Sequence, residues 1–247
     1  REKKGPKKIN SIKKSASATL RRSKHMFIEK PMTTTLDDAK SLISLSKEAD
    51  VKVQIGSQER FNDAFEDVVG LLNKPLLVET KRSVNKNKFL SNQCLVLDFM
   101  INDIDLILNV VKSGVKKITA TALKVFNQVV DLIDVRIEFD NGSIAKLSID
   151  KLGLVDSVVS VFYQTNNVVK VDFVKNTQMI QNKEGEQTQS FNSANSKMNE
   201  LKSFHESIVN DTETKVSLLN GLDTLIVVDK ILDLINHTNI VYNDNIS

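Results

Sequence analysis

The first part of the chain alternates short apolar runs with segments of helical spacing. The run HMFI, residues 25–28, predicts a buried strand, and Thr33 to Thr35 offer an N-cap for a helix over residues 36–49. The stretch VKVQIG, residues 51–56, alternates as a second strand, and residues 60–73 return to helical spacing. This β-α-β-α order predicts a parallel sheet.

The middle of the chain has the strict alternation of a half-buried sheet. Apolar and polar side chains alternate over residues 133–140, and Asn141-Gly142 follows as a strong hairpin signal. Residues 181–199 are polar and of low complexity, which predicts a mobile connection. Residues 216–235 have the spacing of a helix that packs on the sheet. This half therefore predicts a largely antiparallel sheet packed on helices.

Residues 95–111 are nearly all apolar, which predicts a helix buried almost all round. Asp98, Asn102, Asp105 and Asn109 are exceptions at i, i+4, i+7 and i+11, on one narrow stripe of an α-helix. Burying carboxylates costs several kcal/mol unless they are paired or face water. The stripe therefore predicts either side chains that line a cavity, or groups that cap backbone or bond to a neighbouring domain.

The composition is that of a soluble globular protein. The 247 residues are 40% apolar and 26% charged, which suffices for one large domain or two modest ones. The sequence shows neither a membrane-spanning run nor a secretory signal, so we expect a cytoplasmic protein without membrane contact. The single cysteine excludes an intramolecular disulfide, and three scattered histidines argue against a metal site.

Residues 1–24 carry ten Lys or Arg against one acid. This predicts a basic, poorly ordered leader. It could be a solvated tail or the artefact of a truncated or misjoined start, an arm for nucleic acid or an anionic surface, or a segment that resembles an organelle transit peptide. The leader has no aromatic residue for base stacking, which speaks against nucleic acid.

Several motifs resemble the Gfo/Idh/MocA family of NAD(P)-dependent oxidoreductases, which mostly act on sugars, inositols and related polyols. They are the tripeptide EKP at residues 29–31, the helix that follows it, and ERFN at residues 59–62. The segment Val96 to Ser113 is similar to the family's second signature, in which an Asp is followed after three residues by a His and after two more by an Asp. The resemblance covers about residues 15–240 in order.

The resemblance implies an α/β part followed by an α+β part. Residues 25–60 would be a remnant of a Rossmann parallel sheet, and residues 61–247 a larger, mostly antiparallel sheet packed on helices, for substrate binding and dimerisation. The phosphate loop G-x-G-x-x-G cannot be built here, because the eight glycines lie at least eleven positions apart. We therefore expect that the N-terminal nucleotide-binding half is missing and that the cofactor, NAD or NADP, is not bound by this chain alone.

The resemblance also implies roles for individual residues. The catalytic positions would be Lys30, Asp98 and Asn102, the cofactor contacts Glu29, Lys30 and Pro31, and the substrate contacts Arg60, Asn62 and Asp105. In the family the lysine contacts the substrate hydroxyl near the nicotinamide, and the histidine commonly exchanges the hydroxyl proton. Asn102 occupies the histidine position, and a carboxamide holds a hydrogen bond but does not titrate near neutral pH. The proton would then pass through Lys30 or Asp98, or catalysis is lost.

Some of these positions have a second interpretation from the residues alone. Arg60 and Asn62 follow the end of a strand, where α/β proteins place ligand contacts, but they could equally be helix-start residues that bond to backbone. Lys81 and Arg82 end the next strand and could bind an anionic substrate group or be solvated charges.

Two functions follow as hypotheses. The first is an oxidoreductase acting on a sugar or polyol, truncated and impaired in this chain. The alternative is a noncatalytic, degenerate member of the family that serves as a sugar-binding or dimerising subunit. In both, the partners would be a small sugar or polyol and a second copy of the chain, because in the family the open face of the sheet often forms the dimer contact.

Overall fold

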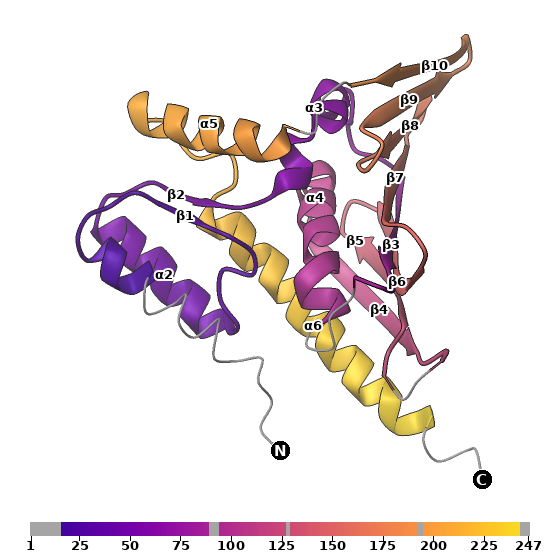
Figure 1. The fold of residues 1–247 in the computed structure, drawn as a ribbon, viewed down its shortest axis with the longest axis horizontal. Coiled ribbons are helices and arrows are strands. Elements are labelled where there is room, and N and C mark those ends of the chain that lie inside the picture. The colour runs from indigo at the N-terminus through magenta and orange to yellow at the C-terminus, as the bar shows by residue number, and fades with distance from the viewer. Residues whose placement is uncertain (1–15, 89–93, 127–128, 192–194, 243–247) are drawn as a thin grey trace.

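The computed structural model describes residues 16–88, 94–126, 129–191 and 195–242, with only the backbone for residues 237–242. The chain forms a small unit around a two-stranded sheet and a large unit around an eight-stranded sheet (Figure 1). The small sheet is parallel and the large one mostly antiparallel, which confirms the predicted fold class.

The small unit is a compact β-α-β element. Strand β1 (Met26–Ile28) pairs in parallel with β2 (Val53–Ile55), and helix α2 (Leu36–Glu48) connects them. The side chain of Thr35 caps α2 by accepting a hydrogen bond from the backbone N–H of Asp38. One face of α2 is buried through Ala39 and Leu42, so the helical spacing of the sequence is explained by its packing on the strands.

The segment predicted as a poorly ordered leader is partly packed. Residues 16–20 form a helical turn, and its Ala16 and Leu20 are buried in the core of the small unit. The prediction was therefore wrong for this part, because the two apolar side chains find partners that the basic composition did not reveal. Residues 1–15 lie outside the described residues.

The large sheet has the order β10-β9-β8-β7-β3-β6-β5-β4. Its strands are β3 (Leu77–Asn85), β4 (Val115–Leu123), β5 (Leu132–Phe139), β6 (Ile144–Gly153), β7 (Ser157–Tyr163), β8 (Asn167–Asp172), β9 (Thr177–Asn182) and β10 (Gly185–Ser190). All neighbours are antiparallel except β3 and β6, which run parallel. The hairpin predicted at Asn141-Gly142 is confirmed, and Gly142 has the positive φ of 86° that favours glycine.

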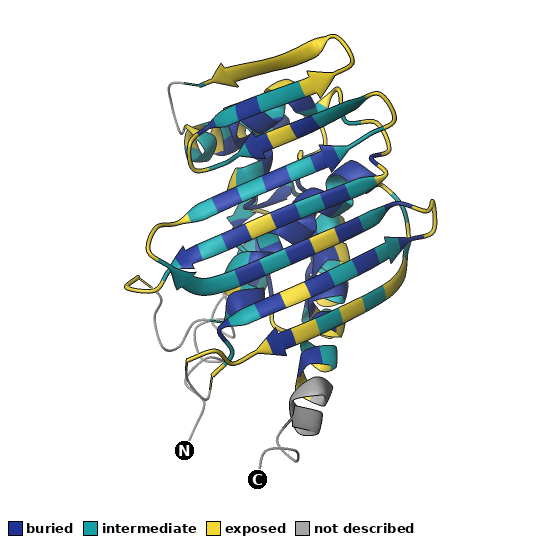
Figure 2. Ribbon diagram, turned by 90° about the vertical axis from the view of Figure 1, so that its right-hand side faces the viewer, coloured by how far each residue is buried: buried dark blue, intermediate teal, exposed yellow. Residues whose placement is uncertain are grey.

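Helices cover one face of this sheet. They include a π-helical turn η2 (Leu95–Met100) that continues into α4 (Ile101–Val111), and α6 (Leu218–Tyr242). Figure 2 shows the opposite face, over which the described part of the chain places no helix. The main core lies between the sheet and α4 and α6, and α6 also supplies Leu218 and Leu225 to the core of the small unit. Helix α6 therefore joins the two units.

Three short elements complete the fold. The 3-10 turn η1 (Gln58–Phe61) and helix α3 (Asp63–Val69) lead from β2 into the large unit, and α5 (Ser196–Val209) packs against η1. The mobile connection predicted for residues 181–199 was wrong over residues 181–190, which belong to the β9–β10 hairpin, and over residues 196–199, which begin α5. Residues 192–194 lie outside the described residues. Every residue of β10 is exposed, so its sequence lacks the alternating apolar positions from which a strand is predicted.

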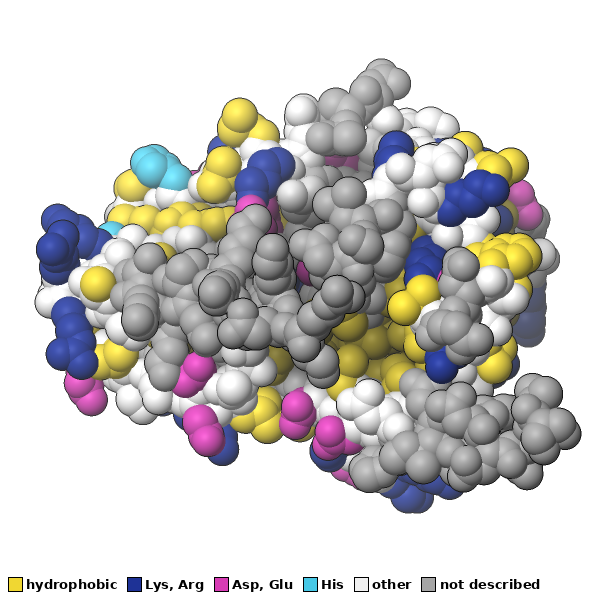
Figure 3. Space-filling view, turned by 60° about the horizontal axis from the view of Figure 1, so that its bottom comes forward, with side chains coloured by type: hydrophobic (Ala, Val, Ile, Leu, Met, Phe, Trp, Pro, Cys, Tyr) yellow, Lys and Arg dark blue, Asp and Glu magenta, His cyan; other side chains and the backbone are white. Residues whose placement is uncertain are grey.

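Two surface properties bear on possible partners. No helix among the described residues is long and apolar enough to cross a membrane. The face in Figure 3 shows Lys and Arg side chains in separate groups with Asp and Glu among them, rather than one continuous basic area.

Candidate functional site

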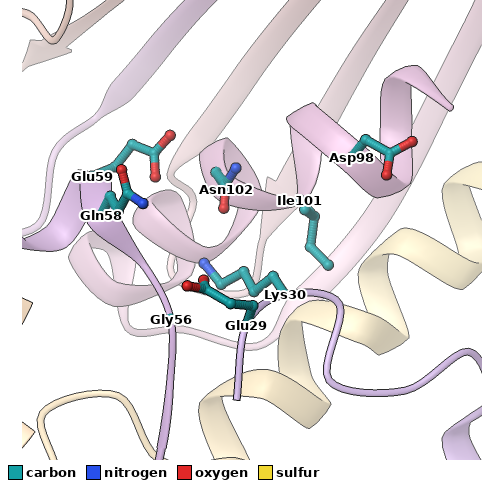
Figure 4. A pocket seen from close by; sticks show the side chains of 8 residues that line it. All are labelled: Glu29, Lys30, Gly56, Gln58, Glu59, Asp98, Ile101 and Asn102. Atoms are coloured by element: carbon teal, nitrogen blue, oxygen red, sulfur yellow. The ribbon is translucent and has the colours of Figure 1, made fainter. Parts of the chain in front are cut away.

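A polar cavity of about 190 Å³ lies beside the carboxyl ends of the two parallel strands. Lys30 follows β1 and Gly56 follows β2, and both reach the cavity because the ends of parallel strands meet at one edge of a sheet. The opposite wall comes from the π turn and the start of α4 (Figure 4). The lining residues are Glu29, Lys30, Gly56, Gln58, Glu59, Asp98, Ile101 and Asn102.

Lys30 is the central cation of this cavity. Its Nζ donates to Asp105 Oδ2 at 2.8 Å and to Ser57 Oγ at 3.0 Å, and its side chain is only 6% exposed. The peptide bond between Lys30 and Pro31 is cis. An ammonium group has three N–H donors, so two are used by these acceptors and one is left for a group inside the cavity.

Asp105 is a fully buried carboxylate between two cations. It accepts from Lys30, from Ser57 Oγ at 2.6 Å and from Arg60 Nε at 2.9 Å and Nη2 at 2.5 Å. Burial alone would raise the pKa of Asp105, but the charges of Lys30 and Arg60 outweigh it and hold the pKa below its usual range. Asp105 is therefore ionised at neutral pH, and it forms an ion pair with Lys30.

Asn102 and Asp98 lie on different parts of the cavity wall. Figure 4 shows the side chain of Asn102 between Glu59 and the tip of Lys30, whereas Asp98 lies apart on the π turn. The Asp98 carboxylate accepts from the backbone N–H of Cys94 at 2.5 Å, and its side chain is exposed. The structure thus brings Lys30 and Asn102 together and leaves Asp98 at the margin.

Arg60 and Asn62 support the site from outside the cavity. Arg60 donates to Asp105 and to Asn109 Oδ1 at 3.0 Å, and it is almost completely buried. Asn62 caps α3 by accepting from the backbone N–H of Phe65 at 3.3 Å. These contacts agree with the interpretation of both as residues that bond within the protein, and a direct contact with substrate stays a prediction.

A second group of charges connects the cavity to α5. Lys197 donates to Glu29 and to Glu200, and the fully buried carboxylate of Glu200 accepts from the backbone N–H of Ser57. Burial raises the pKa of Glu200 despite the opposing effects of this N–H and of Lys197. Ser57 is thus fixed at its backbone by Glu200 and at its hydroxyl by Asp105. The sequence offered no signal for Glu200, which lies 143 residues away from Ser57.

A third group lies behind Glu59. Arg82, on β3, forms a bidentate pair with Asp103 at 2.7 and 2.8 Å and also donates to Glu59 Oε1 at 2.9 Å. Burial opposes ionisation of Arg82, but Asp103 and Glu59 raise its pKa above the ordinary value. Nε and Nη2 donate to these two carboxylates and the side chain is buried, so Arg82 is not a solvated charge, and a contact with an anionic substrate group stays a prediction.

The described residues contain no candidate metal site, and the sequence contains no phosphate-binding glycine loop. Among the described residues no group of three or more His, Cys, Asp or Glu could hold a metal ion. Glu29, Lys30 and Pro31 stand where the reactive end of a dinucleotide could lie, at the carboxyl end of β1. The pyrophosphate needs closely spaced glycines, which the 247 residues do not contain.

Comparison with known proteins matches this arrangement. Residues 11–57 match the model of the Gfo/Idh/MocA oxidoreductase family, described as an NAD-binding Rossmann fold. A UDP-N-acetylglucosamine 3-dehydrogenase of Acidithiobacillus ferrooxidans is 22% identical over 163 residues, which are 66% of this chain and 52% of that protein. The chain thus spans about half the length of the curated relative that it matches.

Solved structures have the same fold at low identity. The same dehydrogenase superposes with a TM-score of 0.89 at 18% identity, over 93% of this chain and 76% of that one. An oxidoreductase of Agrobacterium radiobacter, in complex with NAD+, L-tartaric acid and magnesium, has a TM-score of 0.79 at 14% identity, over 92% of this chain and 75% of that one. A putative myo-inositol dehydrogenase of Sinorhizobium meliloti 1021 has a TM-score of 0.77 at 16% identity, over 93% of this chain and 77% of that one.

The arrangement of a small parallel sheet and a large, mostly antiparallel sheet is shared with these solved structures, and the cavity lies at the carboxyl ends of the two parallel strands. Together with the match of residues 11–57, they confirm the resemblance of this chain to the Gfo/Idh/MocA oxidoreductase family.

Proposed function

We propose that this chain provides the substrate cavity and the catalytic lysine of an NAD(P)-dependent oxidoreductase that acts on a sugar or polyol. The observation that carries the proposal is Lys30, an ammonium paired with buried Asp105 and directed at a polar cavity beside the ends of two parallel strands. The relatives support the substrate class, since they include a nucleotide-sugar dehydrogenase and a putative myo-inositol dehydrogenase.

Lys30 would act on the oxygen of the reacting carbon. Because Asp105 and Ser57 occupy two of its donors, the third can bind a carbonyl or hydroxyl oxygen in the cavity. The charge of the ammonium stabilises negative charge on that oxygen, and during carbonyl reduction Nζ can donate a proton to it. Asn102 can orient the same group by a hydrogen bond. The nicotinamide supplies hydride transfer when it is bound.

The described residues fit only the reactive end of such a cofactor. No residue group is assigned to the pyrophosphate, so the chain's own contribution is the binding and orientation of the substrate and the proton at Lys30.

The proposal is tested with Lys30→Met, which keeps the length of the side chain and removes its charge. Sugar and polyol binding is followed by calorimetry, and turnover with NADH and NADPH by absorbance. Lys30→Met is expected to weaken sugar and polyol binding about tenfold, because the ammonium loses its hydrogen bond to the ligand oxygen. Where the unchanged protein turns over with either cofactor, the variant should also lower turnover at least about 100-fold, because proton transfer and charge stabilisation are both lost. Lys40→Met, at an exposed position of α2, is the matched control and should leave both readings unchanged. Unchanged binding and turnover in folded Lys30→Met would refute the proposal.

One observation favours the noncatalytic alternative. Asn102 lines the cavity, and its carboxamide cannot exchange a proton near neutral pH as a histidine would. A sugar-binding or dimerising subunit would bind sugars with millimolar or better affinity and show no turnover with either cofactor. The variant Asn102→His separates the two functions, since only a chain that retains the rest of the catalytic site should gain turnover from an imidazole. The oligomeric state of the protein, by sedimentation, tests the dimer contact through the open sheet face.

A further inference from the structure

The wall of the cavity carries more negative than positive charge. Three of its side chains are carboxylates, those of Glu29, Glu59 and Asp98, and its one cation is Lys30. Figure 4 shows Glu59 on one side of Lys30 and Asp98 on the other, with Glu29 beside the lysine. A group that enters the cavity therefore meets carboxylates from several directions.

The cations behind the cavity wall do not neutralise this excess of negative charge. Arg82, behind Glu59, is also paired with Asp103, and Lys197, beside Glu29, is also paired with buried Glu200. Lys30 itself shares Asp105 with Arg60. The wall and its ion-pair partners thus contain four cations, Lys30, Arg60, Arg82 and Lys197, and six carboxylates, Glu29, Glu59, Asp98, Asp103, Asp105 and Glu200.

The hydrogen-bonding groups of the cavity wall favour a ligand with many hydrogen-bond donors. One oxygen of Glu59 accepts from Arg82 and one oxygen of Asp98 accepts from the Cys94 N–H, which leaves each carboxylate a second acceptor. The wall donates through Lys30 and through the amides of Gln58 and Asn102. Sugar hydroxyls donate and accept, whereas a phosphate or carboxylate only accepts and adds a like charge.

From these charges we infer that the cavity selects the uncharged, hydroxyl-bearing part of its substrate and rejects a phosphate or carboxylate substituent there, with Glu59 as the main specificity-determining residue. Glu59 has this role because its side chain is 16% exposed and is held in place by Arg82, while the side chain of Glu29 is 60% exposed at the margin. The inference rests on the proposed function, because it concerns the same cavity.

The test compares sugars that differ only in charge. D-glucose is paired with D-glucuronate and D-galactose with D-galacturonate, since each pair exchanges a C6 hydroxymethyl for a carboxylate on the same ring. Binding to the full chain is measured by saturation-transfer NMR titration at low salt. In at least one pair the neutral sugar should bind roughly tenfold more tightly than its uronate. Added salt should reduce this difference in affinity, because salt screens the repulsion between like charges.

Two variants test whether the preference for neutral sugars arises in the cavity. Glu59→Gln keeps the size of the side chain and removes its charge, so the preference for the neutral sugar should shrink several-fold, while Arg82 keeps Asp103 as its partner. Glu138→Gln removes a carboxylate from the large sheet, where Glu138 forms an ion pair with Arg136, and should leave the preference intact.

The outcomes separate the inference from the proposed function. If both uronates bind as tightly as their neutral sugars, or if Glu59→Gln does not change the preference, the inference is overturned and the sugar-binding proposal still stands. A folded protein that binds none of the four sugars overturns the proposed function, and the inference with it.

Discussion

Asp105 combines complete burial with contacts to both Lys30 and Arg60, and this makes it the residue on which the site depends. Removing one member of a buried ion group leaves the other charges without compensation. In Asp105→Asn two cations would face each other with only neutral acceptors between them. A change at this single position should therefore affect stability and ligand binding together.

We predict that Asp105→Asn lowers the free energy of unfolding by about 3–5 kcal/mol at pH 7, as measured by urea denaturation. The pKa of Asp105 is lowered in the folded protein, so its ionised form contributes stability above the pKa of the unfolded state, about 3.9. This contribution is lost as the pH falls through the folded pKa, and the variant should approach the wild type in stability at low pH. Asp134→Asn, at an exposed position of β5, is the control and should cost less than about 0.5 kcal/mol. An equal cost for both variants would contradict the central role of Asp105.

The sequence predicted the site at the level of single residues only in part. Lys30 and Asn102 both line the cavity, as the resemblance implied for a catalytic pair, although their roles stay predictions. The polar stripe was deduced from α-helical spacing, but residues 95–100 form a π turn, which shifts Asp98 relative to the α-helical residues after it. Asp103 lies off this stripe, yet it is buried and paired with Arg82, because β3 presents a partner that helical periodicity cannot show.

At the scale of elements, the hairpin between β5 and β6 was predictable because its turn has a local cause. Gly142 has a positive φ, and no atom lies within 4 Å of the position that a Cβ would take. We predict that Gly142→Ala lowers the free energy of unfolding by about 1 kcal/mol through backbone strain alone. Gly70→Ala is the matched control, because Gly70 has a right-handed helical φ of −65° and equally open space. Chemical denaturation should show no loss, or a gain of up to about 1 kcal/mol, for the control.

The β9–β10 hairpin was not predictable in the same way. Strand β10 is exposed at every residue, so no apolar alternation marks it, and its pairing with β9 is supplied by backbone hydrogen bonds at the end of the sheet. Strands β5 and β6, in contrast, each bury alternate residues against the helices and therefore show the period in the sequence. Strand prediction succeeded where one face is buried and failed where neither is.

On the scale of the whole molecule, the two units differ in the size of their cores. The large unit buries a continuous apolar cluster between the sheet and helices, whereas the small unit has a short cluster around α2 and a two-stranded sheet. Two-stranded sheets are marginal without further packing, which α6 provides here. The contacts of α5 and α6 with β2 and η1 join segments more than a hundred residues apart, which no local pattern could predict.

We predict that Leu42→Ala, in the buried face of α2, costs about 2–5 kcal/mol locally and opens the small unit before the large one. Native-state hydrogen exchange should show faster exchange over β1, α2 and β2, with protection of β5 and β6 retained. The corresponding change in the large unit, Leu147→Ala in β6, should instead raise exchange in the sheet. Uniform loss of protection across both units in Leu42→Ala would show that α6 couples them into one cooperative body.

The position of β3 in the large sheet also has a consequence for synthesis on the ribosome. Strand β3 lies between β6 and β7, and its Glu79 is 67 residues from Lys146, the β6 residue that it faces. At about 5–20 residues per second, β3 leaves the ribosome roughly 3–13 s before β6 leaves it. During that interval its backbone donors and acceptors have no strand to pair with, so a nascent chain stalled before residue 144 should be a better chaperone client than one stalled after residue 163.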